Sequence, residues 1–143
     1  MPCQGVAPGA SFEPDMSKTS TSRRPRLLLV EDDTAVRRAL QLLLTGRGFE
    51  VRAYGSGLAL LADPERLAAD ALVADYRMPD LDGLMILRRL RDEGWNGRAL
   101  LITAFHSGPL IDEALKIGFS RVVEKPLVDI AFADAVERLV AAP

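Results

Sequence analysis

Cysteine, histidine and long apolar runs are scarce in this sequence of 143 residues. Its one cysteine, Cys3, excludes an internal disulfide and a metal–thiolate cluster, and it fits a reducing compartment. No run of about 18 apolar residues is present, so no membrane span is expected. No apolar signal-peptide core precedes Arg23, and we expect a cytoplasmic protein. The net charge of −2 gives no electrostatic reason to expect direct DNA binding.

The chain length fits a single domain behind a short tail. Residues 1–24 contain prolines, serines and threonines without apolar periodicity, which predicts a disordered N-terminal tail. The domain is expected over residues 25–143, and Met16 is an alternative start of the chain. A basic cluster at the end of the tail is interpreted as a solvated flank rather than a partner-binding patch; it consists of Arg23, Arg24 and Arg26.

Short apolar runs alternate with longer amphipathic segments five times after the tail. The runs predict buried strands and the segments predict helices. This alternation predicts an α/β fold, a five-stranded parallel sheet of order 2-1-3-4-5 with helices on both faces, which is the flavodoxin-like arrangement. The expected strands are Leu27–Val30, Glu50–Tyr54, Ala71–Asp75, Ala99–Thr103 and Arg121–Glu124. The expected helices are Thr34–Thr45, Leu58–Ala69 with an interruption near Asp63-Pro64, Gly83–Glu93, Ser107–Ile117 and Val128–Ala142.

Two side-chain placements follow from the same patterns. In the first predicted helix, leucines and a valine recur on one face, which leaves Arg37 and Arg38 on the outward face. Trp95 lies between Gly94 and Gly97, so we expect a loop residue that covers a helix end.

Asp75 is the acid around which the rest of the chain is organised. It ends a short apolar run, at the strand end where open α/β sheets place their ligands. Pro79 excludes a helical Met78, and turn-forming residues follow it. On its own, an aspartate at this position is as often a cap or a turn former as a functional group.

Other charged residues are expected beside Asp75. Glu31 and Asp32 follow the first strand, which neighbours the third in the predicted order, so the three carboxylates should converge. Like charges at such distances disfavour ionisation unless a cation offsets them. Mg²⁺ suits oxygen ligands of this kind, and the backbone carbonyl of Arg77 is a further candidate ligand. Lys125, after the fifth strand, should point into the same pocket.

Four segments give this chain its resemblance to a known family: LLLVEDD, LVADYRMPDLDG, LLITAF and VVEKPL. In this order and spacing they resemble the receiver domain of two-component response regulators, from about Arg26 to Ala142. The resemblance implies a bacterial signalling protein that is not an enzyme in its own right. Its partners would be a sensor histidine kinase or a histidine phosphotransfer protein, and a downstream target that the sequence does not identify.

The resemblance also implies roles for single residues. Asp75 matches the phosphoacceptor, and Glu31 and Asp32 match the acidic pair that holds Mg²⁺ directly or through water. Thr103 matches the hydroxyl that contacts the phosphoryl group, and Lys125 matches the lysine that pairs with it. The proline that follows this lysine in the family commonly comes after a cis peptide bond, and here it is Pro126.

Several positions depart from the family pattern or stay open. The family often has an aromatic switch residue where this chain has Val122, so we expect signalling through Thr103 and the segment Ser107–Ile117. Glu31 replaces a more common aspartate and should still serve the metal. Arg77 and Phe105 follow Asp75 and Thr103 by two residues, where they could tune dephosphorylation or be ordinary rim residues. The one histidine, His106, is expected in a solvent-facing loop.

Four functions are candidates for this chain. The leading hypothesis is a stand-alone phosphoacceptor, with homodimer formation left open. The second is the receiver portion of a hybrid histidine kinase or longer regulator. A flavin-binding electron carrier of the same fold is disfavoured because the acidic loop after the first strand would repel a phosphate. A Mg²⁺-dependent phosphohydrolase would need an acid where the chain has Arg77.

Overall fold

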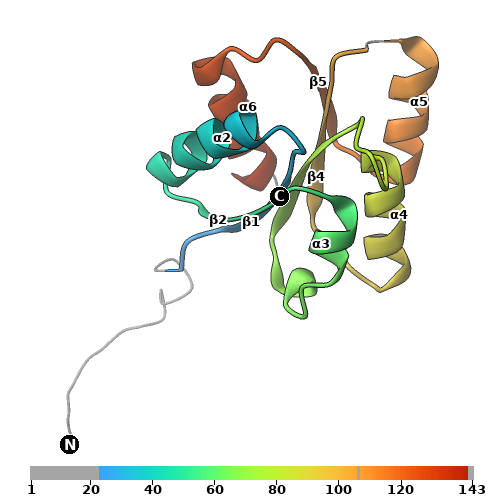
Figure 1. The fold of residues 1–143 in the computed structure, drawn as a ribbon, viewed down its shortest axis with the longest axis horizontal. Helices are drawn as coiled ribbons and strands as arrows, with labels where there is room; N and C mark the ends of the chain where they lie inside the picture. The colour runs from blue at the N-terminus through green and yellow to red at the C-terminus, as the bar shows by residue number, and fades with distance from the viewer. Residues whose placement is uncertain (1–22, 106, 142–143) are drawn as a thin grey trace, which may run out of the picture.

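A five-stranded parallel sheet in the order β2-β1-β3-β4-β5 forms the centre of the fold (Figure 1). The structure is a computed structural model that describes residues 23–105 and 107–141. The predicted strand order is confirmed, and each predicted strand is found within one residue of its expected bounds. The strands are β1 (Arg26–Val30), β2 (Glu50–Tyr54), β3 (Ala71–Asp75), β4 (Arg98–Thr103) and β5 (Arg121–Glu124).

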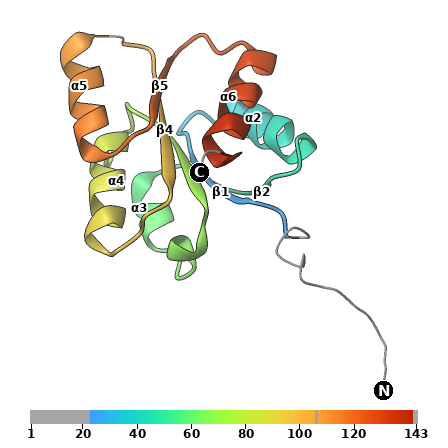
Figure 2. The same cartoon turned by 180° about the vertical axis from the view of Figure 1, so that it is seen from behind.

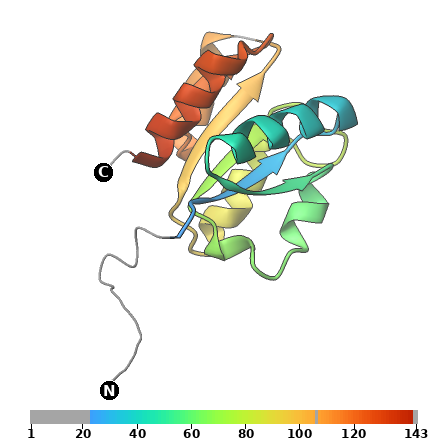
Figure 3. The ribbon, with the colours of Figure 1, turned by 90° about the vertical axis from the view of Figure 1, so that its left-hand side faces the viewer.

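Helices cover both faces of the sheet, as predicted. Helices α2 and α6 lie on one face, and α3, α4 and α5 lie on the other (Figures 1 and 2). Figure 3 shows α2 and α6 side by side in front of the sheet. No helix within the described residues is long and apolar enough to cross a membrane. The helices are α2 (Thr34–Gly46), α3 (Gly57–Leu61), α4 (Gly83–Asp92), α5 (Gly108–Ile117) and α6 (Asp129–Ala141).

The sheet separates two apolar cores. In β1, Leu28 and Val30 face the core beneath α3, α4 and α5, whereas Leu27 and Leu29 face the core beneath α2 and α6. All four side chains are at most 1% exposed. Successive strand residues point to opposite faces, so a strand covered on both faces must be apolar throughout. This explains why the central strands are continuous apolar runs in the sequence.

Side-chain caps start four of the helices immediately after the strands and loops that lead to the candidate site. The side-chain oxygens of Asp33, Ser56, Asp82 and Ser107 accept hydrogen bonds from the first turns of α2, α3, α4 and α5. Such caps satisfy backbone N–H groups that have no partner inside the helix. The helix starts are therefore set by residues at the functional edge of the sheet.

The helix expected over Leu58–Ala69 is interrupted near Asp63-Pro64, as predicted, since α3 ends at Leu61 and the chain resumes over Arg66–Ala68 as a 3-10 helix instead of an α-helix. The break comes at Pro64, which lacks the N–H of a helix interior. Trp95 lies in the loop between α4 and β4, as expected, but it is part of the core and not a surface cover, since it is 4% exposed and its indole N–H donates to the Ala69 carbonyl at 2.8 Å.

Some expectations concern parts of the chain that are not described. Residues 1–22 of the predicted tail, the alternative start Met16, and His106 lie outside the described residues. The basic cluster itself is described, and its first residue, Arg23, forms an ion pair with Asp70 at 3.1 Å.

A polar network holds the edge strand β2 to the segment that follows α3. The Tyr54 hydroxyl donates to Asp63 Oδ2, and Arg52 Nη1 lies 2.8 Å from the same oxygen. The hydrogen bond from Tyr54, with help from the Glu65 N–H and Arg52, lowers the pKa of Asp63 from 3.8 to about 2. The ionised carboxylate therefore stabilises the fold.

We expect this contribution to be lost in acid. Because the folded pKa of Asp63 lies below its ordinary value, its stabilisation is present above about pH 4 and disappears as the pH falls toward 2. The full effect is at most about 2 kcal/mol, because solvent around this partly exposed network screens the charge. Urea denaturation from pH 6 to pH 3 should show a stability difference between the wild type and Asp63→Asn that narrows with acidification. A difference that stays constant over this range would contradict the assignment.

Candidate functional site

Three carboxylates meet at the carboxyl end of the sheet. Strands β1 and β3 are neighbours, with Val30 paired to Ala74, so the residues that follow them lie side by side. One carboxylate oxygen from each of Glu31, Asp32 and Asp75 lies within 4.8 Å of the others. Glu31 and Asp75 are 1% and 4% exposed, whereas Asp32 is exposed. The structure thus brings together the acids that the sequence placed in one pocket.

Lys125 supplies the positive charge of this cluster. Its Nζ lies 2.9 Å from Asp75 Oδ2 and 3.4 Å from Glu31 Oε1. The residue follows β5, and its backbone N–H donates to the Thr103 carbonyl at 2.8 Å, which fixes the start of the side chain. The peptide bond between Lys125 and Pro126 is cis, as expected.

The pKa values in the cluster reflect burial and crowding. Burial is the largest cause that raises the pKa of Glu31 from 4.5 to about 7, and the neighbouring charge of Asp75 raises it further. The Asp33 N–H and Lys125 act in the opposite direction. Burial acts to lower the pKa of Lys125, but its hydrogen bond to Asp75 and the two carboxylate charges outweigh this, and the pKa is raised. The pocket therefore favours positive charge.

The donor set fits a hard divalent cation. All three candidate ligands are carboxylate oxygens, the ligand type that Mg²⁺ prefers, and exposed Asp32 leaves the group open to water. If all three acids are ionised, the charge of −3 balances that of Lys125 and one divalent ion. Arg77 lies two residues beyond Asp75 with an exposed side chain, and its carbonyl as a ligand stays a prediction.

The other acids around the pocket have structural partners. Asp33 caps α2 through the Val36 N–H at 3.0 Å. Asp80 accepts the N–H groups of Gly57 and Leu58 at 3.2 and 2.8 Å, and so holds the loop after β3 to the start of α3. Asp82 caps α4. Among the acids of these two loops, this leaves Glu31, Asp32 and Asp75 for the pocket.

Thr103 ends β4 and is fully buried. Its hydroxyl donates to the Phe105 carbonyl at 3.0 Å and accepts from the Phe105 N–H at 2.9 Å. The hydroxyl predicted to serve the pocket therefore lies at the expected strand end, and its hydrogen bonds are made to the loop that leads into α5.

The remaining predicted residues lie around this pocket or behind it. Val122 in β5 is half-buried and packs against the core beneath α3, α4 and α5. Arg77 and Phe105 are both exposed, and Phe105 is 58% exposed. Their positions are compatible with a role at the rim, and that role stays a prediction.

Arg37 is the residue whose place the helical pattern predicted wrongly. It is half-buried rather than outward, and its Nη1 donates to the Glu31 carbonyl at 2.7 Å and to the Asp32 carbonyl at 3.5 Å. The sequence contained one signal for this placement of Arg37. A cation in the first turn of a helix interacts unfavourably with the helix dipole, so such a residue is expected to find acceptors nearby.

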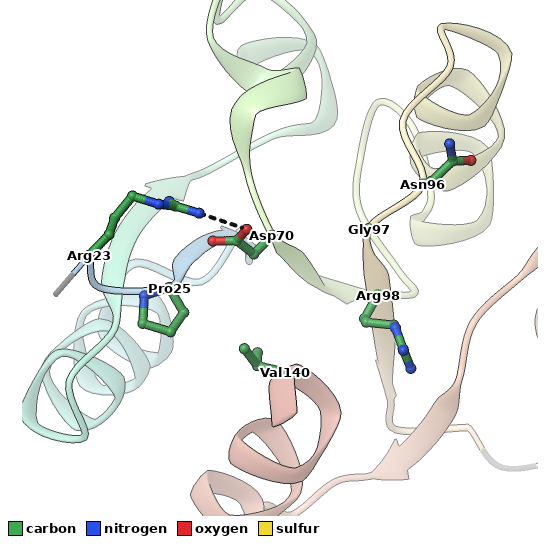
Figure 4. Close-up of a pocket in the computed structure, with 7 residues that line it drawn as sticks. All are labelled: Arg23, Pro25, Asp70, Asn96, Gly97, Arg98 and Val140. Atoms are coloured by element: carbon green, nitrogen blue, oxygen red, sulfur yellow. Dashed lines mark hydrogen bonds and ion pairs between the residues drawn. The ribbon is translucent and has the colours of Figure 1, made fainter. Parts of the chain in front are cut away.

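A second pocket lies at the opposite edge of the sheet. It has a volume of about 380 Å³ and is open, and the Arg23–Asp70 ion pair crosses one side of it (Figure 4). Its lining comes from the starts of strands and from the end of α6, far from Asp75 in the fold. The lining residues are Arg23, Pro25, Asp70, Asn96, Gly97, Arg98 and Val140.

Comparison with known sequences gives one family. The model of the response regulator receiver domain matches residues 27–137. The transcriptional regulatory protein FixJ of Rhizobium meliloti is 38% identical over 110 residues, which are 77% of this chain and 54% of that protein. The response regulator MprA of Mycobacterium leprae is 38% identical over 101 residues, which are 71% of this chain and 44% of that protein. The chain thus spans about half the length of these relatives.

Solved structures agree with this match. The crystal structure named FixJ-N has a TM-score of 0.73 and 33% identity, and the superposition covers 85% of this chain and 97% of that one. The chemotaxis protein CheY4 of Vibrio cholerae has a TM-score of 0.77, with 82% of this chain and 99% of that one covered. At 21% identity, the second likeness supports the fold alone.

Proposed function

Because this chain belongs to the response regulator receiver domain family, we propose that it is the phosphoacceptor of a two-component phosphorelay, with Asp75 as the accepting residue. One observation carries the proposal. Asp75 is a buried carboxylate at the end of β3 that receives a hydrogen bond from Lys125 and has Glu31 and Asp32 beside it.

The proposed reaction moves one phosphoryl group. A carboxylate oxygen of Asp75 attacks the phosphorus of a phosphohistidine on a sensor histidine kinase or a histidine phosphotransfer protein. The P–O bond forms as the P–N bond breaks, and the electron pair of that bond returns to the imidazole of the partner. The product is an aspartyl phosphate, and later attack by water releases inorganic phosphate and restores the carboxylate.

The residues of this chain position the reactants and offset charge. Phosphoryl transfer needs alignment and electrostatic stabilisation more than further covalent chemistry. Lys125 Nζ already contacts Asp75, so a phosphoryl oxygen added there would lie within its reach. Glu31 and Asp32 would hold Mg²⁺, which when bound would offset the charge on the phosphoryl oxygens.

The proposed output runs through Thr103. Its hydroxyl is bonded to Phe105, and an aspartyl phosphate would offer it stronger, charged acceptor oxygens. If the Thr103 hydroxyl exchanged its hydrogen bonds to Phe105 for bonds to the phosphoryl group, the loop between β4 and α5 would be released. The surface that this loop and α5 present to a downstream partner would then change. The relative FixJ is named a transcriptional regulatory protein. For this chain, the absence of direct DNA binding stays a prediction, and so does homodimer formation.

The two alternative chemistries have less support. A flavin carrier would place a phosphate near the loop after β1, where Glu31 and Asp32 are acidic. A phosphohydrolase would need an acid two residues beyond Asp75, and Arg77 is there.

Replacement of the acceptor tests the proposal most directly. Asp75→Asn should lose all labelling by a phosphorylated kinase or by acetyl phosphate, because an amide is neither anionic nor nucleophilic. Labelling is measured by intact-protein mass spectrometry, with Asp80→Asn as the control that keeps its label. Undiminished labelling of Asp75→Asn, with the phosphate mapped to another residue, would refute the assignment.

The metal is tested by removing one of its proposed ligands. Asp32→Ala should weaken Mg²⁺ binding by at least about tenfold and reduce the rise in melting temperature that Mg²⁺ causes in the wild type. Asp112→Ala removes the same charge from the exposed face of α5 and should leave both values unchanged. Full labelling of Asp75 in excess chelator would show that the acidic pocket does not require a divalent ion.

The output route is tested at Thr103 and Val122. Couplings of about 1–3 kcal/mol between sites change affinity from several-fold to about a hundredfold. Thr103→Ala should reduce the difference in partner binding or self-association caused by beryllium fluoride, and Thr103→Ser should retain it. Val122→Ala should lower the melting temperature through lost packing and leave most of the difference intact. The opposite pattern in folded variants would exclude this route.

A further inference from the structure

We propose that Arg37 is a positioning residue of the acidic pocket, which holds the backbone around Asp32 so that the carboxylates of Glu31 and Asp32 point toward the bound cation. This inference rests on the proposed function, because that function places Mg²⁺ in the pocket. It assigns a role to a positive side chain beside a cation site, where its charge alone would be unfavourable.

The contacts of Arg37 fix the peptide planes on both sides of Asp32. Nη1 donates to the Glu31 carbonyl at 2.7 Å and reaches the Asp32 carbonyl at 3.5 Å, while Nη2 lies 3.5 Å from Thr34 Oγ1. A peptide unit is planar, so the two carbonyl directions determine the backbone dihedrals of Asp32 and hence the direction of its Cα–Cβ bond. One guanidinium therefore orients the side chain between these carbonyls.

Asp32 depends on its backbone for this orientation. Its side chain is exposed, and within the described residues no donor forms a hydrogen bond with its carboxylate. Glu31 differs, since it is buried, its Oε2 accepts the Asp33 N–H at 3.1 Å, and its Oε1 contacts Lys125. Loss of the guanidinium contact should therefore affect Asp32 most.

The surroundings leave room for Arg37 in this position. A Cβ atom at Gly55, just after β2, would lie 3.1 Å from Arg37 Nη1. The Glu31 N–H also donates to the Tyr54 carbonyl at 3.1 Å, so the first acidic residue is tied to the end of β2. The guanidinium thus lies between the loop after β1 and the glycine after β2, and it is not a mobile surface charge.

Arg38 offers a matched control on the same helix. It is the next residue of α2 and is exposed, so its replacement removes an equal charge without disturbing the carbonyls. Electrostatics alone predicts that loss of either arginine tightens the binding of a cation, and more so for Arg37, which is nearer. Positioning predicts that loss of Arg37 weakens cation binding. The two explanations therefore differ in the direction of the affinity change and not only in its size.

The experiment measures Mg²⁺ affinity by calorimetry on metal-free protein, together with the melting temperature of each variant. We expect Arg37→Gln to weaken Mg²⁺ binding about tenfold, as is typical when partners of metal ligands are removed. Arg37→Lys should bind nearly as weakly, because an ammonium keeps the charge but lacks the planar fork. Arg38→Gln should change the affinity by about twofold or less, since its charge is exposed and screened.

Several outcomes would overturn the inference. Binding by Arg37→Gln that is as tight as, or tighter than, that of Arg38→Gln would show that Arg37 contributes charge only. Full wild-type affinity of Arg37→Lys would show that the fork is not needed, and this variant also decides the matter if Arg37→Gln does not fold. A wild-type protein without Mg²⁺ binding would refute the proposed metal site itself, and the inference with it.

Discussion

Two carboxylates are buried side by side at the end of this sheet, and the Lys125 ammonium between them makes that arrangement tolerable. Burial of like charges is costly unless a cation compensates them. Lys125 reaches both Asp75 and Glu31 from the far side of β4, so the compensation depends on the order β1-β3-β4-β5. The raised pKa of Glu31 shows that one lysine does not remove the whole cost. A proton on Glu31 or a bound cation would offset the remaining negative charge, and the cation links the electrostatics of the fold to the proposed metal.

Much of this arrangement could be predicted because it follows from strand order. Apolar runs of four to six residues, separated by amphipathic segments, determine a parallel sheet covered on both faces, and a parallel sheet collects its strand ends at one edge. Glu31, Asp75 and Lys125 each come within one residue of a strand end, so their meeting follows from topology without knowledge of any side chain. Strand order alone does not separate Asp32 from the adjacent Asp33, and the structure gives a physical reason for the prediction of Asp32, since Asp33 caps α2.

The wrong predictions share a cause, which is that a side chain reached a partner distant in sequence or beyond its own helical face. Helical periodicity places Arg37 outward because it counts positions around an axis, whereas a long side chain can turn back to carbonyls of the preceding loop. Trp95 lies between glycines, and its buried indole N–H finds its acceptor in the Ala69 carbonyl 26 residues earlier. The interruption near Asp63-Pro64 could be predicted because its cause is local, since Pro64 lacks the N–H of a helix interior.

Under the proposed function, the same geometry indicates which neighbour of Asp75 would move most easily when a phosphoryl group is added. Glu31 and Lys125 are anchored by several backbone and side-chain contacts, and Asp80 holds the loop after β3 to α3. Thr103 is different, because within the described residues its hydroxyl bonds only to Phe105, which lies in an exposed loop, and these hydrogen bonds can be exchanged for others. Added charge at Asp75 therefore meets two anchored neighbours, Glu31 and Lys125, and a third neighbour, Thr103, whose hydrogen bonds can be exchanged. A receiver without an aromatic ring at position 122 would still have a way to move the start of α5, since the motion begins at the hydroxyl and not at the ring.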